Sequence, residues 1–336
     1  MRVLITGITG FVGSYLADYI LEHHPEVELF GACRWRSPLD NIKHLIGLVP
    51  IIVGDLIDPS AVRHILEASK PDRIFHLAAQ SYVPASFRQP RETLNTNIMA
   101  ELNLLHGLRE KLAGSMLVAG SSEEYGKVER GTGPINEQHE LLPLSPYAVS
   151  KVCQDLLAYQ YNQAYGVHVV RTRAFNHEGP RRGDVFATSA FCKQIAQIET
   201  GLQKNKILVG NLEAIRDYTD VRDIVKGYWL ALEKGSPGDV YNFCSGAATG
   251  IWYNPANNKR IWSISELLTF LLKQAQVTDI EVVKDPERYR PADVPFLFGD
   301  FTKANQELGW KPEIRLEQTW TEMLAFWRNK IVALGN

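Results

Sequence analysis

The sequence lacks the features that would tie it to nucleic acid, a membrane or a metal ion. Its 336 residues include 36 Lys and Arg against 38 Asp and Glu, so a net charge of −2 supplies no basic field for nucleic acid. No apolar run approaches the roughly 18 residues of a membrane span, and glycines interrupt the opening MRVLITGITGFVG where a signal peptide would be apolar. The four cysteines are scattered, without a CxxC pair or the spacing of metal ligands. We therefore expect a cytoplasmic chain with reduced thiols that binds no metal, membrane or nucleic acid.

Short apolar runs alternate with helical patterns over residues 1–175. Strands are expected at 3–5, 27–32, 49–53, 73–77, 115–119 and 167–171, and helices at 11–22, 60–68, 92–111 and 146–165. Strands that alternate with helices in this way form a parallel sheet covered on both faces. The pattern predicts an α/β fold with a Rossmann-like, doubly wound parallel sheet.

After residue 175 the alternation loosens, although no repeat or low-complexity tract marks a linker. We expect residues 1–175 to form a larger lobe that 215–245 rejoin, and residues 176–214 and 246–336 to form a smaller C-terminal lobe that binds substrate. The segment 247–262 carries three aromatic residues. The sequence leaves open whether they line a pocket, contact a partner subunit or fold over a cleft.

Three glycines, Gly7, Gly10 and Gly13, follow the first expected strand and open the first helix. In this context the first permits a tight turn, the second lets the backbone approach a pyrophosphate at the helix N-terminus, and the third allows close helix–strand packing. The turn therefore predicts a dinucleotide cofactor, with its adenine beside Asp55 and Leu56. The other predicted cofactor contacts near the turn and the fourth strand are Thr9, Phe11, Val12, Leu77, Ala78 and Ala79.

The second expected strand ends without the acidic residue that selects NAD. In its place Arg34 and Arg36 are positioned to hold a 2′-phosphate through charge-assisted hydrogen bonds. The alternative is a pair of solvated surface arginines without a ligand. We predict NADP rather than NAD, which makes residues 1–175 the NADP-binding lobe.

Tyr147 and Lys151 stand four residues apart at the start of an expected helix and so share one face. Tyrosine is a poor base because its ordinary pKa is about 10, but a nearby ammonium favours the phenolate. We expect Lys151 to supply that charge and to bond the cofactor ribose, so that Tyr147 exchanges a proton with a substrate hydroxyl.

Ser121 and Glu123 follow the fifth strand, at the edge of the sheet where ligands bind. We expect Ser121 to bond the reacting oxygen and Glu123 to act as an acid or base on a neighbouring carbon. The alternative for Glu123 is a solvated loop carboxylate.

Several motifs occur in the order of a known family. They are TGITGFVGSYLA, HLAAQSYVPASFRQP, SSEEYG, SPYAVSK, FNHEGPRRG and the closing RPADVPFLFGD with LGWKP. Together they resemble, over nearly the whole chain, the GDP-mannose 4,6-dehydratase branch of the extended short-chain dehydrogenases/reductases. The resemblance implies a Rossmann-like fold, a tightly held NADP, and a nucleotide-diphosphate sugar as substrate, GDP-linked in this branch. It also implies the catalytic set Ser121, Glu123, Tyr147 and Lys151.

The same motifs resemble a sister group, the GDP-4-keto-6-deoxymannose reductases. VGNLEAIRDYTDVRD, GDVYNFCSG and Pro295 are closer to the reductases, whereas AAQSYVPASF and NHEGPRRG are closer to the dehydratases. Dehydration of GDP-mannose is the leading interpretation, reduction of a 4-keto-6-deoxy sugar is the second, and 4-epimerisation is the third. A non-catalytic NADP sensor on the same fold is a different class, against which the Ser121, Tyr147 and Lys151 group argues.

The substrate contacts are also implied by the resemblance. Asn176 would touch the sugar diphosphate, and Glu178 would lie near the nucleotide base. Arg216 and Arg290 would grip the diphosphate bidentately. The remaining predicted contacts are Lys193, Gln80, Ser81, Ser122 and Glu123 on the substrate side and His177 on the cofactor side. The long helices at 92–111 and 146–165 commonly form a four-helix interface in this superfamily, so we expect a homodimer or homotetramer.

Overall fold

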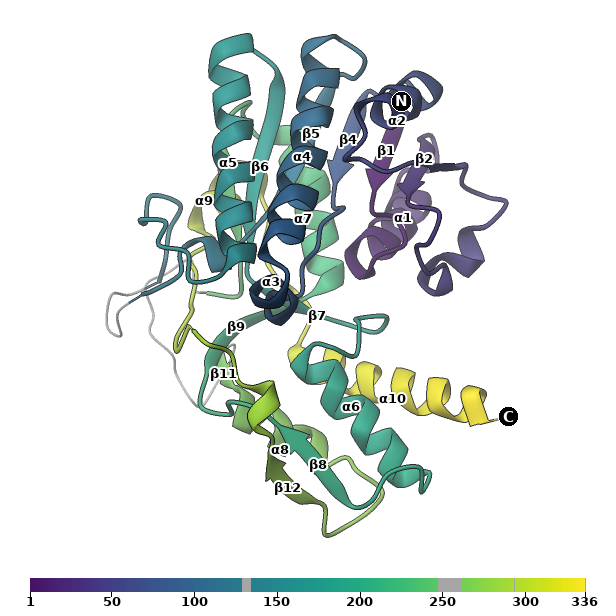
Figure 1. Ribbon diagram of the computed structural model, residues 1–336, viewed down its shortest axis with the longest axis vertical. Helices are drawn as coiled ribbons and strands as arrows, with labels where there is room; N and C mark the ends of the chain where they lie inside the picture. The colour runs from purple at the N-terminus through teal and green to yellow at the C-terminus, as the bar shows by residue number, and fades with distance from the viewer. Residues whose placement is uncertain (129–133, 247–260, 293, 336) are drawn as a thin grey trace.

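The computed structural model describes residues 1–128, 134–246, 261–292 and 294–335, and Figure 1 shows that they form a larger and a smaller lobe. The first half of the chain contains β1 (Arg2–Thr6), α1 (Phe11–His23), β2 (Glu28–Cys33), η1 (Asp40–Leu45), β3 (Ile51–Val53), α2 (Pro59–Ser69), β4 (Arg73–His76), α3 (Val83–Arg88), α4 (Pro90–Arg109), β5 (Ser115–Ser121), η2 (Ser122–Glu124), α5 (Pro146–Tyr165) and β6 (His168–Ala174). The second half contains β7 (Asn176–Glu178), α6 (Ala187–Glu199), β8 (Lys206–Val209), β9 (Ile215–Asp220), α7 (Val221–Lys234), β10 (Val240–Phe243), β11 (Ile261–Ser263), α8 (Ile264–Leu272), β12 (Glu281–Lys284), η3 (Pro286–Arg288), α9 (Thr302–Leu308) and α10 (Leu316–Gly335). Of the aromatic segment 247–262, residues 247–260 lie outside the described residues.

The larger lobe is built on a seven-stranded sheet in the order β10-β6-β5-β4-β1-β2-β3. Every neighbouring pair of strands in it is parallel. Helices cover both faces: one core lies under α1 and α7, and a second lies under α2, α4 and α5. The strand order reverses direction between β1 and β4, which is the place where a doubly wound sheet opens a crevice for ligands. The predicted Rossmann-like fold is confirmed.

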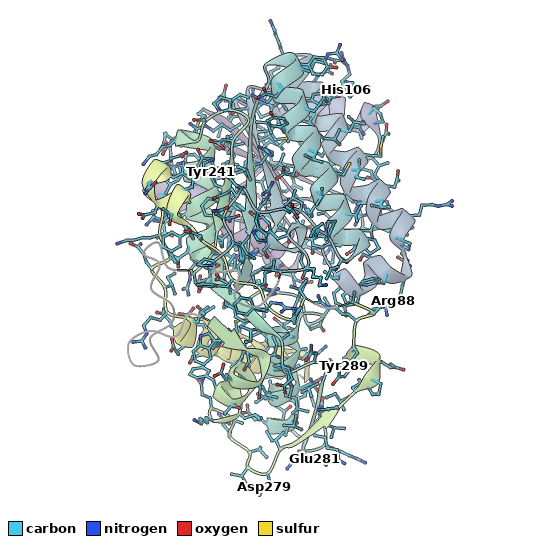
Figure 2. The ribbon with its side chains drawn as sticks, turned by 90° about the vertical axis from the view of Figure 1, so that its left-hand side faces the viewer. Arg88, His106, Tyr241, Asp279, Glu281 and Tyr289 are labelled. Atoms are coloured by element: carbon cyan, nitrogen blue, oxygen red, sulfur yellow. The ribbon has the colours of Figure 1, made fainter. Side chains whose placement is uncertain are left out.

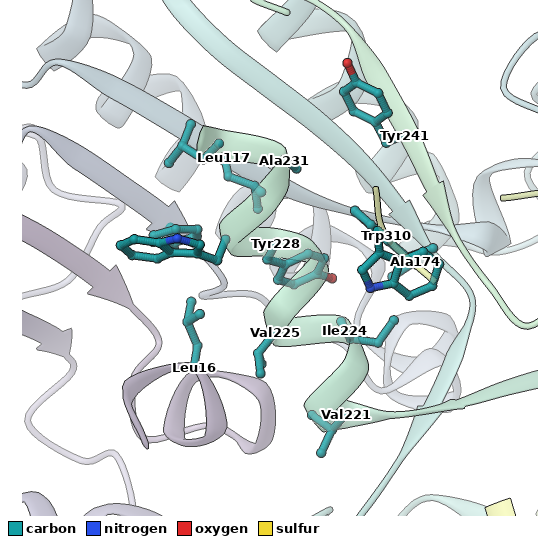
Figure 3. Close-up of a cluster of buried hydrophobic side chains, with 14 of the residues drawn as sticks. Leu16, Leu117, Ala174, Val221, Ile224, Val225, Tyr228, Ala231, Tyr241 and Trp310 are labelled. Carbon is teal, nitrogen blue, oxygen red and sulfur yellow. The ribbon is translucent and has the colours of Figure 1, made fainter. Parts of the chain in front are cut away.

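Helix α7 shows how the second half of the chain is anchored to the first. Figure 3 shows its apolar side chains, including Ile224 and Val225, packed between Leu16 of α1 and residues of the sheet such as Leu117. Asp220 caps this helix by accepting a hydrogen bond from the Arg222 N–H at 2.8 Å. Helix α2 is capped in the same way, because the Asp58 carboxylate accepts a hydrogen bond from the Ser60 N–H at 2.8 Å.

The smaller lobe has its own core, in which α6, α8 and α10 pack around the buried Trp320. It also contains the parallel pair β8–β12 and a three-stranded sheet in the order β11-β9-β7. The observed lobe boundaries differ from the expected ones in two places. Strand β9 pairs with β7 and β11 rather than with the large sheet, so the chain rejoins the larger lobe at α7. Helix α9 packs on α7 and β10, because the Trp310 ring that follows it is buried against Phe243.

Candidate active site

Three cavities along the carboxyl ends of the strands form one continuous cleft. A cavity of about 390 Å³ lies beside β2 and β3, a central one of about 280 Å³ lies over β1, β5 and the start of α5, and an outer one of about 490 Å³ lies against the smaller lobe. The first two share Gly7, Gly10, Leu77 and Ala79 in their walls. The central and outer cavities share Asn176, Arg182, Phe186 and Arg290. Figure 2 shows Arg88 and Tyr289, both in the wall of the outer cavity, at the level where the two lobes meet.

The glycine turn has the backbone geometry that a pyrophosphate requires. Gly7 has a φ of +71°, and a Cβ atom there would lie 2.8 Å from the backbone of Ala78. A Cβ atom on Gly13 would lie 2.3 Å from the Gly7 carbonyl oxygen. Gly10 begins α1 without a side-chain cap, so the first N–H groups of the helix face the cavity without a side chain in the way. The turn therefore fits the phosphates of a dinucleotide.

The first cavity contains most of the residues predicted to hold the adenosine half of the cofactor. Thr9, Arg34, Asp55, Leu56 and Ala78 all line it. Arg36 differs, because its guanidinium lies 4.3 Å from the centre of the exposed Trp35 ring and outside the described cavities. Gln80 also lines this cavity, where its side chain donates a hydrogen bond to Thr93 and accepts one from the Tyr82 N–H. Gln80 was expected on the substrate side, yet both ends of its amide are used to hold the chain after β4.

The four predicted catalytic residues line the central cavity together. Ser121 ends β5, Glu123 lies in η2, and Tyr147 and Lys151 lie on the first turns of α5. Helix α5 begins where it was predicted because Ser145 caps it and Pro146 occupies its first position. The cap fixes Tyr147 and Lys151 on the face of the helix that turns toward the sheet.

Tyr147 and Lys151 are both buried, and burial acts on the pKa of each. Burial raises the pKa of Tyr147 above its usual range, and a hydrogen bond with Ser121 opposes that rise. The Lys151 ammonium donates a 2.7 Å hydrogen bond to the Ala119 carbonyl, and burial lowers the pKa of Lys151. The hydrogen bond with Ser121 is thus the largest influence that favours the phenolate of Tyr147.

Two adjacent glutamates are directed to opposite sides of η2 by a capping box. The Ser121 hydroxyl accepts from the Glu123 N–H at 3.2 Å, and the Glu124 carboxylate accepts from the Ser121 N–H at 2.6 Å. Glu124 is fully buried beside Arg173, whose Nε lies 3.2 Å from its carboxylate. Glu123 faces the cavity, and its carboxylate lies 3.5 Å from Arg290 of the smaller lobe.

His177 lies in the central cavity as a neutral imidazole. Burial lowers its pKa to about 4. Its Nδ1 lies 2.9 Å from the Phe175 carbonyl oxygen, which can only accept a hydrogen bond, so Nδ1 is the protonated nitrogen of the neutral ring. Its ring stacks on Phe11 with a centroid separation of 6.1 Å. This arrangement makes His177 a wall of the cleft rather than a proton carrier at neutral pH.

The outer cavity brings together most of the predicted substrate contacts. Asn176, Glu178, Arg216 and Arg290 line it. Glu178 is buried, accepts from the Thr188 hydroxyl at 3.0 Å and pairs with Arg182 at 3.3 Å. Lys193 does not line this cavity, although its ammonium lies 2.6 Å from the carboxylate of Asp184, which does.

Sequence reasoning missed several residues of the cleft. Arg182, Phe186 and Tyr228 line the central cavity. Arg182 lies in the NHEGPRRG motif, which also contains the predicted residues Asn176 and Glu178, so the same motif is the signal that points to Arg182. Tyr228 is indistinguishable in the sequence from the apolar positions of α7, and Phe186 follows a polar loop that carries no periodic signal.

Comparison with known proteins gives a consistent result. A family model described as GDP-mannose 4,6 dehydratase matches residues 4–323. The GDP-6-deoxy-D-mannose reductase of Pseudomonas aeruginosa is 34% identical, covering 98% of each chain. A GDP-mannose 4,6-dehydratase of Vibrio cholerae is also 34% identical, covering 96% of this chain and 92% of that protein. The solved structure of RMD from Pseudomonas aeruginosa complexed with NADPH has a TM-score of 0.81 at 32% identity, covering 98% of this chain and 100% of that chain.

Two other classes of feature are absent from the described residues. No helix in them is both long and apolar enough to cross a membrane. They contain no group of three His, Cys, Asp or Glu side chains arranged to hold a metal ion.

Proposed function

The chain belongs to the GDP-mannose 4,6-dehydratase family, and we propose that it is an NADP-dependent enzyme that dehydrates GDP-mannose to the 4-keto-6-deoxy sugar. The observation that carries this proposal is the position of Glu123. Its carboxylate faces the cavity that also contains Tyr147, Ser121 and Lys151. Dehydration needs a base for a carbon-bound proton next to the carbon that is oxidised, and Glu123 is the acidic side chain in that place.

When bound, NADP supplies the nicotinamide that takes up hydride from the sugar and returns it. Tyr147 removes the hydroxyl proton at sugar carbon 4, assisted by the hydrogen bond with Ser121. A ketone at carbon 4 acidifies the proton at carbon 5, which Glu123 removes as water leaves carbon 6. Arg290 and Arg216 in the outer cavity hold the diphosphate, and the first cavity with Arg34 holds the phosphorylated ribose of NADP.

Reduction of a 4-keto-6-deoxy sugar is the second candidate. It is favoured by the full-length similarity to the Pseudomonas reductase and by the NADPH complex of RMD. A reductase uses the same Tyr147 and Ser121, but it consumes NADPH in every cycle and needs no base at carbon 5.

Purified protein with GDP-mannose distinguishes the two reactions, when product mass and cofactor absorbance are followed together. Loss of one water without net change in NADPH supports dehydration. If GDP-mannose is unchanged while the 4-keto-6-deoxy product oxidises NADPH, the protein is the reductase. Glu123→Gln is expected to stop water loss while leaving NADPH binding intact, and the exposed Glu140→Gln serves as the matched control.

We also propose that the protein forms a homodimer or homotetramer through α4 and α5. Helix α5 exposes Val149, Leu156 and Tyr159 at 44%, 54% and 45%, which is unusual for large apolar side chains on one helix. Light scattering that gave a monomer at micromolar concentration would refute this assembly. A reducing, cytoplasmic location is part of the same proposal and is supported by free thiols at all four cysteines.

A further inference from the structure

Glu124 is a fully buried carboxyl beside the catalytic residues that the proposed reaction does not use. It does not line the central cavity, although Ser121, Ser122 and Glu123 before it all do. A Cβ atom added to Gly120 would lie 2.5 Å from the Glu124 Oε1, so the carboxyl packs tightly against the backbone at the end of β5. A glutamate is almost never fully buried unless its carboxyl has partners, so the partners of Glu124 indicate its role.

The first partner of Glu124 is the backbone of the predicted catalytic serine. Its Oε1 accepts a hydrogen bond from the Ser121 N–H at 2.6 Å. The Ser121 hydroxyl oxygen accepts from the Glu123 N–H at 3.2 Å, so residues of η2 hold both the backbone and the side chain of Ser121. A hydroxyl that accepts through its oxygen still has one proton to donate. That proton is left for the hydrogen bond between Ser121 and Tyr147, which both line the cavity.

The second partner is the buried Arg173 of β6, which anchors the carboxyl. Its Nε lies 3.2 Å from the Glu124 Oε2, as an ion pair without the geometry of a hydrogen bond. The same Nε lies 3.0 Å from Asp155 of α5, and the guanidinium donates to the Tyr125 hydroxyl at 3.2 Å. Arg173 therefore connects the turn after β5 to the helix that carries the predicted catalytic tyrosine and lysine.

The contact between Glu124 and Ser121 does not depend on whether the carboxyl is ionised. Burial and the neighbouring Asp155 raise the pKa of Glu124 to about 8, and Arg173 opposes that rise. A carboxylate and a neutral carboxylic acid both have an oxygen that accepts an N–H. The Ser121 backbone therefore requires an acceptor at the reach of a glutamate side chain, whatever its charge.

We propose that Glu124 is a positioning residue for the reaction: its carboxyl, anchored on Arg173, holds the Ser121 N–H and so fixes the Ser121 hydroxyl beside Tyr147. The inference rests on the roles of Ser121 and Tyr147 in the proposed function, which dehydration and reduction share. Without this carboxyl the buried Ser121 N–H loses its partner, and the turn is free to move. Displacing a group of the active site by about 1 Å can lower a reaction rate about a hundredfold.

The test uses two substitutions that separate the reach of the acceptor from its charge. Glu124→Gln removes the charge but keeps an oxygen at the same reach, and Gln also serves at this position of a capping box. Glu124→Asp keeps the charge but is one methylene shorter. We expect Glu124→Asp to lower kcat about tenfold or more, with KM and the NADPH dissociation constant unchanged, and Glu124→Gln to keep the wild-type kcat. The assay is whichever of the two proposed reactions the wild type catalyses.

Glu199 provides the matched control, because it has the same two kinds of partner in the smaller lobe. Its carboxylate accepts from the Gln276 N–H at 2.8 Å and pairs with Arg328 at 2.7 Å. It lines none of the three cavities of the cleft. Glu199→Asp is expected to lower the stability toward urea, as Glu124→Asp does, while leaving kcat at the wild-type value. The loss of kcat is thereby separated from a loss of stability.

Wild-type kcat in Glu124→Asp, or an equal loss of kcat in Glu124→Gln, would overturn the proposal. A loss that appears in KM or in NADPH affinity instead of kcat would overturn it as well, and so would an equal fall of kcat in Glu199→Asp. If Glu124→Asp does not fold, Glu124→Met takes its place, since it fills the space without supplying an acceptor.

Hydrogen exchange of the Ser121 N–H gives a readout that needs no sugar substrate. It is followed by NMR in protein labelled with ¹⁵N-serine, and Ser121→Ala identifies the signal. Exchange should be fast in Glu124→Asp and stay slow in Glu124→Gln, and equal rates in the two variants would contradict the proposal. Absence of sugar turnover in the wild type refutes the proposed reaction but leaves these exchange rates readable, so the two failures are distinguishable.

Discussion

Replacing Gly13 with Ala sets two opposing effects against each other at the cofactor turn. Gly13 lies inside α1, where Ala is favoured over Gly by about 1 kcal/mol through helix propensity. The new Cβ, however, would lie 2.3 Å from the Gly7 carbonyl oxygen, and real Cβ atoms essentially never approach closer than 3.0 Å. The turn must therefore open by at least the difference, 0.7 Å.

The overlap is expected to outweigh the gain in helix propensity. The Gly7 oxygen belongs to the backbone and the new Cβ is attached directly to it, so neither atom can move away by a rotamer change. The Gly7 oxygen accepts the Gly10 N–H at 2.9 Å, so moving it displaces the N–H groups that face the pyrophosphate. Overpacking of this kind costs about 1–3 kcal/mol, which offsets or exceeds the helical gain. We expect the dissociation constant of NADPH, measured by fluorescence titration, to rise about tenfold or more, which corresponds to about 1.4 kcal/mol.

Gly107→Ala provides the control, since it is the same change inside another helix with nearly the same overlap. Its Cβ would lie 2.2 Å from Leu66 Cδ1, the end of a flexible side chain that can change rotamer. Its NADPH affinity should match that of the wild type. Wild-type affinity in Gly13→Ala, or an equal loss in both variants, would refute the argument that backbone overlap at the turn controls cofactor binding.

Three further outcomes are expected. Arg34→Ala should weaken NADPH about tenfold or more and leave NADH unchanged in the same titration, because it removes a charge-assisted contact to the 2′-phosphate; equal effects on both cofactors would contradict this. Asp217→Asn should lower the free energy of unfolding in urea by about 2–4 kcal/mol, since Asp217 accepts from the Ser245 N–H and hydroxyl and from the Gly299 N–H, and an amide cannot accept all three. His177 stays neutral in the folded protein until the pH approaches its pKa of about 4. In the unfolded chain the same histidine has its ordinary pKa of about 6.5, so it is protonated first as the pH falls. The wild type should lose about 3 kcal/mol more than His177→Gln between pH 6.5 and 4, and parallel stability curves would contradict the assignment.

The strands and helices of the larger lobe could be predicted because their signals are local. Apolar runs, the glycine turn and the Ser145–Pro146 start of α5 each determine a backbone conformation within a few residues. Strand β9 could not be placed from sequence, because its pairing with β7 depends on a register set by residues about forty positions earlier in the chain. The same limit applies to α9, whose position depends on the burial of Trp310 against Phe243.

The candidate site was predictable where a residue type and a spacing together define the chemistry. Tyr147 with Lys151, and the three glycines of the turn, are of this kind. Arg36 and Lys193 were less predictable, because a cation contacts whichever aromatic ring or carboxylate lies within reach, here Trp35 and Asp184.

The arrangement around Glu123 bears on the choice between dehydration and reduction. The capping box turns Glu124 into the core and leaves Glu123 in the cavity, where Arg290 approaches it from the other lobe to 3.5 Å. Arg290 also lines the outer cavity in which the diphosphate is proposed to lie, so the negative charge of an arriving diphosphate competes with Glu123 for the same guanidinium. Seating the sugar nucleotide then weakens the ion pair and frees the Glu123 carboxylate to contact the sugar. Dehydration requires that carboxylate to remove the proton at carbon 5, whereas a reductase has no carbon-bound proton to remove, so the release of Glu123 serves the proposed dehydration.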